Sequence, residues 1–134
     1  MILKDVLIYL RNNTALATIM NNRIYSVQAP SSVQMPYLII EPTSGMRESI
    51  VFNVTGGKAW FRITVDVGPT DEVNGYTMIW TALRALENYR GDMGDTKDVV
   101  VTCGEPRGWA GIGGAYRYQF EAYFEYTEDR QTPH

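Results

Sequence analysis

The clearest pattern along the chain is an alternation of apolar and polar positions that gives way to a helical repeat. Between residues 61 and 67 every second residue is aromatic or β-branched, which is typical of a strand with one buried face. Pro69 then ends the strand because its backbone nitrogen cannot donate a hydrogen bond. From Val73 to Leu86 apolar residues recur at helical spacing over roughly half of the helix circumference. We therefore predict a central helix, ending near Gly91, with more apolar surface than a sheet alone would cover.

Similar patterns predict the remaining elements. A one-sided apolar stripe indicates a helix over residues 2–12, and a further short helical turn is expected over 15–20. Residues 37–67 read as an antiparallel hairpin with a long projecting connection over 45–57. The other expected elements are an extended segment at 23–25, a strand at 99–103, a glycine-rich loop at 104–114 and a final strand at 116–126.

This order of elements predicts the fold class. Helix, hairpin, helix and two strands suggest a single α+β domain over residues 1–128. Consecutive strands joined by a hairpin favour a mainly antiparallel sheet of about four strands, with two helices packed on one face. Residues 129–134 are expected to form a polar tail.

Composition narrows the function classes. The chain has 134 residues, of which 45% are hydrophobic, and a formal charge of −3, so it can build one ordinary core. Its basic residues are scattered, which disfavours sequence-specific nucleic-acid binding. A single cysteine, Cys103, rules out an internal disulfide, and no apolar run reaches membrane-spanning length. We expect a soluble protein without a membrane segment.

The sequence offers little catalytic chemistry. The sole histidine is His134, the last residue, so histidine-dependent nucleophilic sites are excluded in their usual forms. Asp92, Asp95 and Asp98 lack the pattern of a calcium loop and read as a solvated acidic turn. The glycines of residues 104–114 lack both phosphate-binding arrangements. We therefore expect no enzyme activity, no metal and no cofactor.

Two alternatives stay open. Asp66, Glu121 and Glu125 could form a carboxylate-based active site on the wetter sheet face, although Arg62 and Arg117 favour ordinary cross-strand charge pairing. The chain could also be a stand-alone ligand-binding module that uses the aromatic sheet face and Trp109 as a pocket. These alternatives predict, respectively, a deep cleft and a bound small molecule.

Surface suited to partner contact is the more unusual feature. Apolar residues occur on both long loops and on the over-wide central helix, and exposed apolar patches mark protein contacts. The alternative is that these loops fold back over the domain's own core. The candidate contacts between subunits or with partners are Arg47, Glu48, Ile50, Val51, Phe52, Met78, Tyr89, Trp109 and Ile112.

Several short motifs follow one another in a definite order. Asn22-Arg23-Ile24-Tyr25 precedes Ala29-Pro30 and Met35-Pro36-Tyr37. An R-x-x-V-D-V strand occupies 62–67, the helix closes with Leu83-Arg84-Ala85-Leu86 and Tyr89-Arg90-Gly91, and the last strand covers 117–126. In this order and spacing, from about residue 2 to 128, the chain resembles the small tail-completion proteins of long-tailed bacteriophages.

The resemblance implies a structural virion protein, made in the cytoplasm of a bacterial host and located in the tail or neck. Proteins of this family are similar to tail terminators and head-to-tail joining proteins. They form a ring, typically of six subunits, at the top of the tail tube. The implied partners are other copies of the chain, the tail-tube protein and the head connector, and DNA would pass through the ring non-specifically.

Overall fold

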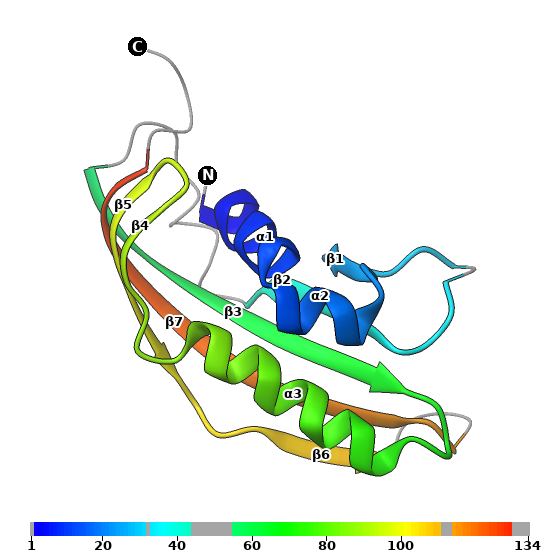
Figure 1. Ribbon diagram of the computed structural model, residues 1–134. Helices are drawn as coiled ribbons and strands as arrows, with labels where there is room; N and C mark the ends of the chain where they lie inside the picture. Colours follow the sequence, from blue (N-terminus) through cyan, green and yellow to red (C-terminus); the bar gives the residue numbers. More distant parts are fainter. Residues whose placement is uncertain (1, 32, 44–54, 111–113, 130–134) are drawn as a thin grey trace.

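The computed structural model describes residues 2–31, 33–43, 55–110 and 114–129. These residues form three helices and seven strands (Figure 1). The helices are α1 (Ile2–Asn12), α2 (Thr14–Met20) and α3 (Glu72–Leu86). The strands are β1 (Ile24–Ser26), β2 (Tyr37–Pro42), β3 (Thr55–Val67), β4 (Arg90–Met93), β5 (Thr96–Cys103), β6 (Arg107–Ala110) and β7 (Tyr116–Asp129).

All seven strands belong to one sheet in the order β1-β2-β3-β7-β5-β4, with β6 paired to β7. The sheet is antiparallel except for β1, which runs parallel to β2. The 14-residue β7 pairs with β3 along one side and with β5 and β6 along the other. Because Cys103 opposes Ala122 and Arg107 opposes Gln119, three residues on this edge face two on β7. The edge that β5 forms along β7 is therefore continued by β6, after an irregularity of the β-bulge kind.

The prediction of about four strands and two helices is wrong, although the class remains α+β and mainly antiparallel. The added strands have three or four residues each, too few to show an alternating pattern. Two of them lie in segments that the sequence indicated as turn or loop: β4 beside the acidic turn and β6 within the glycine-rich 104–114 stretch.

Capping residues explain the helix count and the helix ends. Asn13 accepts a hydrogen bond from the Leu16 backbone nitrogen at 3.0 Å, so α2 begins as a separate helix after α1. Asn21 then ends α2 in a left-handed conformation. The central helix ends at Leu86, earlier than expected. Asn88 has a positive φ of 61°, and the chain then turns into β4 at Arg90.

The core lies on one face of the sheet, here called the inner face. The long strands β3 and β7 curve around the three helices, which all lie on this side (Figure 1). Phe61, Ile63, Val65 and Val67 are fully buried, as the alternation over residues 61–67 predicts. The opposite face of this strand is not the wetter face that the pattern suggests, because Thr64 and Asp66 are each only 4% exposed. On β7 the inner-face residues Phe120 and Phe124 are buried as well, and Phe61 meets Phe124 edge to face with ring centroids 5.3 Å apart. The other side, the outer face, carries the charged strand residues.

Candidate protein-binding groove

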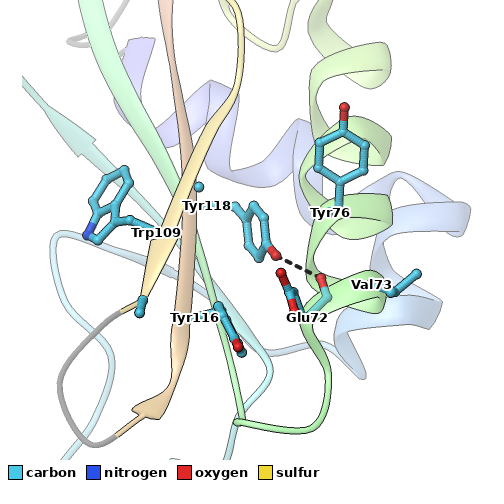
Figure 2. A pocket seen from close by; sticks show the side chains of 8 residues that line it. Glu72, Val73, Tyr76, Trp109, Tyr116 and Tyr118 are labelled. Atoms are coloured by element: carbon cyan, nitrogen blue, oxygen red, sulfur yellow. Dashed lines mark hydrogen bonds between the residues drawn. The ribbon is translucent and has the colours of Figure 1, made fainter.

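A groove with a volume of about 560 Å³ opens between the N-terminal end of α3 and β6 (Figure 2). In the described chain β6 pairs only with β7, so its other edge is open, and all four of its residues are exposed. An open strand edge presents unpaired backbone groups to any segment that lies beside it. The groove is lined by Glu72, Val73, Tyr76, Gly108, Trp109, Ala110, Tyr116 and Tyr118.

Tyr118 forms the floor of this groove. Its ring lies between β7 and α3, and its hydroxyl donates a hydrogen bond to the Glu72 carbonyl oxygen at 2.8 Å (Figure 2). Two glycines make room for the ring: a Cβ at Gly75 or at Gly108 would lie 2.6 or 2.5 Å from it. Desolvation by burial, followed by the charge of Glu72, raises the pKa of Tyr118. The phenol therefore stays neutral and keeps its donor at physiological pH.

The rim of the groove is apolar and exposed. Val73 is 78% exposed and Tyr76 is 54% exposed. Tyr76 contacts Trp80 and Tyr118 edge to face, with ring centroids 6.1 and 6.3 Å apart. Large exposed aromatic and aliphatic side chains around a concave surface are typical of a protein contact. The arrangement can bind an apolar segment, and Glu72 is the charged residue among those that line it.

The outer face separates the carboxylates that an active site would need to bring together. In the β3–β7 register, Asp66 lies opposite Arg117 and Glu121 lies opposite Arg62. Glu125 lies opposite Lys58 in the same way. Successive carboxylates are four residues apart on the same strand or across it, which corresponds to about 13 Å. Each acidic group therefore faces a basic residue, as cross-strand pairing predicts.

The structure places some of the predicted contact residues and not others. Trp109 is exposed and is one of the groove-lining residues, but its side chain projects from the side of β6 that faces away from the groove (Figure 2). Met78 and Tyr89 are partly buried and pack against the core. The other predicted contacts lie outside the described residues: Arg47, Glu48, Ile50, Val51, Phe52 and Ile112.

Glu72, Val73, Tyr76 and Tyr118 are groove residues that the sequence pattern did not single out. The helical repeat placed Val73 and Tyr76 in the stripe that faces the sheet. Gly75 is the residue of this turn that is buried. The available signal was the pair of glycines Gly75 and Gly108, which both approach the Tyr118 ring, because glycine permits close packing.

Among the described residues, no three His, Cys, Asp or Glu side chains are grouped so as to hold a metal ion. Burial, followed by the charge of Glu87, raises the pKa of the Cys103 thiol to about 11, so it stays protonated and weakly reactive at neutral pH. None of the described helices has the length and apolar character needed to cross a membrane.

Comparison with known proteins gives structural likeness alone. No protein-family profile matches the sequence, and no curated protein matches it. A chain from the virion of a native gene transfer agent particle has a similar fold, with a TM-score of 0.69, 15% identity and coverage of 92% of this chain and 91% of that chain. A second solved structure, of a protein without a functional name, has a TM-score of 0.57 and 12% identity, with coverage of 98% of both chains. The chain therefore has a fold that also occurs in a virion component.

Proposed function

We propose that the protein is a structural virion component that completes the phage tail and joins it to the head connector. It would do so as a ring of subunits, six in the family that it resembles, at the top of the tail tube. The observation that carries this proposal is the fold likeness to a gene transfer agent virion chain over more than nine-tenths of both chains. The ordered sequence motifs support the same assignment.

The geometry suits assembly by contact. A ring seam joins two different patches of the same protein, so each subunit needs two complementary surfaces. The groove beside β6 supplies one apolar patch, and the 45–57 segment with Ile50, Val51 and Phe52 is the proposed second. The net charge of −3 fits a channel through which DNA slides without adhering, because DNA affinity comes mainly from cationic groups.

Genetics in the phage or prophage that encodes the protein tests this role. Deletion of the gene should give filled heads and separate tails, and the wild-type gene supplied in trans should restore joined particles. A variant with Ile50→Ser and Phe52→Ser should fold but fail to restore joining. Electron microscopy of the purified protein mixed with tail tubes should show density at one tube end. Normal infectious particles from the deletion strain would refute the proposal.

A second candidate, a ligand-binding module, is favoured by the same groove, because apolar walls and one tyrosine hydroxyl suit a small aromatic molecule. Screening of the isolated protein by thermal denaturation would test it. A compound that raises the midpoint for the wild type and has no effect on a Tyr76→Ser variant would support this candidate. A screen without such a compound, together with a head-joining defect in the deletion strain, would remove it.

A further inference from the structure

We propose that the groove between β6 and α3 receives residues 44–54 of a neighbouring copy of this chain. In this arrangement Ile50 and Phe52 of one subunit seat on Val73 and Tyr76 of the next. The inference rests on the proposed ring and names the two surfaces that would form its seam.

The chemistry of the segment matches that of the groove. Residues 44–54 read Ser-Gly-Met-Arg-Glu-Ser-Ile-Val-Phe-Asn-Val, with three consecutive apolar residues of high strand propensity at 50–52. The groove offers an apolar rim and the open edge of β6, the surface to which an extended apolar segment adds in β-augmentation. Glu72 is the charged residue of the groove lining, and Arg47 is the only basic residue in the segment.

The position of the segment rules out its own groove as the target. Gly108 lies opposite Tyr118 and Thr55 lies opposite Glu128, so the end of the segment is ten β7 residues, or about 33 Å, from the groove. Its start is at Thr43, which bonds to the Trp60 carbonyl opposite Tyr123, about 17 Å from the groove.

A path from Thr43 to the groove and back to Thr55 therefore needs about 50 Å of chain, before the width of the sheet is added. Twelve Cα steps separate Thr43 from Thr55, and a fully extended chain of that length spans at most about 43 Å. The segment can reach the groove of another copy but not its own. Because the segment and the groove are two different patches of the chain, the proposed contact is head-to-tail, which is the kind that closes into rings.

A synthetic peptide of residues 44–54 with blocked ends tests the contact on the full-length protein. Isotope-labelled protein titrated with this peptide should show saturable changes in the amide signals of residues 72–76 and 107–110. A peptide with Ile50→Ser and Phe52→Ser should bind at least about tenfold more weakly, as expected when central apolar anchors are lost. Protein with Tyr76→Ser should show the same loss, whereas Ile8→Ser, at an exposed apolar residue on α1, should bind normally.

Charge exchange tests the orientation. A peptide with Arg47→Glu should bind the wild-type protein more weakly and regain affinity for a Glu72→Arg variant. Absence of saturable binding, or equal binding by wild-type and Tyr76→Ser protein, would overturn the proposal. That result would leave the virion role standing if the deletion strain still fails to join heads to tails. Normal particles from that strain would refute the role independently of any peptide.

Discussion

Arg117 binds Asp66 across the outer face through two parallel hydrogen bonds, from Nε to Oδ1 at 2.8 Å and from Nη2 to Oδ2 at 2.9 Å. The Asp66 side chain is only 5% exposed, whereas that of Arg117 is 47% exposed. Tyr37 lies opposite Asp66 on β2, and its pKa is raised first by burial and then by the nearby carboxylate charge. The pair therefore holds a nearly buried negative charge at the centre of three strands.

Removal of the guanidinium should destabilise the protein because the Asp66 carboxylate would stay buried without its partner. We expect Arg117→Leu to lower the free energy of unfolding by about 2 kcal/mol, less than for a fully buried pair because Arg117 is half exposed. Urea denaturation measures the loss. The matched control is Arg62→Leu, opposite the exposed Glu121, which should cost about 0.5 kcal/mol or less. Equal losses for the two variants would contradict this explanation.

The close approach of β6 to Tyr118 gives a second prediction. A Cβ at position 108 would lie 2.5 Å from two atoms of the Tyr118 ring, so Gly108→Ala should displace the strand or the ring. We expect a loss of about 1–3 kcal/mol in stability, as for other overpacked sites. Thermal and urea unfolding would report it.

Gly68→Ala is the control for the glycine substitution. An added Cβ there meets nothing within 4 Å, and Gly68 does not have a positive φ. The alanine should change stability by less than about 1 kcal/mol, toward greater stability, because it restricts the unfolded chain. Similar losses for Gly68→Ala and Gly108→Ala would show that the Tyr118 contact is not the cause.

The long strands were predictable from the sequence, whereas the short ones were not. Alternation over residues 61–67 and 116–126 indicates which side chains face the core, and the structure buries the apolar set of each except Tyr116, which is partly buried. The three- and four-residue strands β1, β4 and β6 form because the long neighbours β2, β5 and β7 offer backbone partners. Such pairing is a tertiary effect that leaves no periodic signal in a short segment.

The candidate site was predictable only in part. Trp109 drew attention as a large aromatic residue in a glycine-rich stretch, and it is exposed. Val73 and Tyr76 follow the helical repeat of the buried stripe, yet α3 packs at this turn through Gly75, which lies against Tyr118 and Val67. Because Gly75 faces the sheet, its neighbours Val73 and Tyr76 face outward. A periodicity count that scores only apolar residues does not place glycine on the buried face, so it predicts the wrong orientation for this turn.

Cys103 should give a pH-dependent contribution to stability. Its folded pKa is raised to about 11 from the model-peptide value of 9.0, chiefly by burial and then by Glu87. The unfolded chain therefore loses this proton first, so the contribution is present below pH 9.0 and is lost as the pH rises through about 11. The stability of the wild type relative to Cys103→Ala should fall across this window. A constant difference would contradict the raised pKa, which thiolate absorbance can check directly.

The two ends of the apolar arc on α3 should respond differently to polar substitution. Met78 is partly buried and packs against the core, so Met78→Ser should lower the free energy of unfolding by about 1–3 kcal/mol through lost apolar contacts. Val73 is 78% exposed, and Val73→Ser should change stability by no more than about 0.5 kcal/mol. Urea denaturation of the two variants side by side measures the difference. If Val73→Ser destabilised the monomer as much as Met78→Ser, the groove rim would be part of the core and could not serve as a free contact surface.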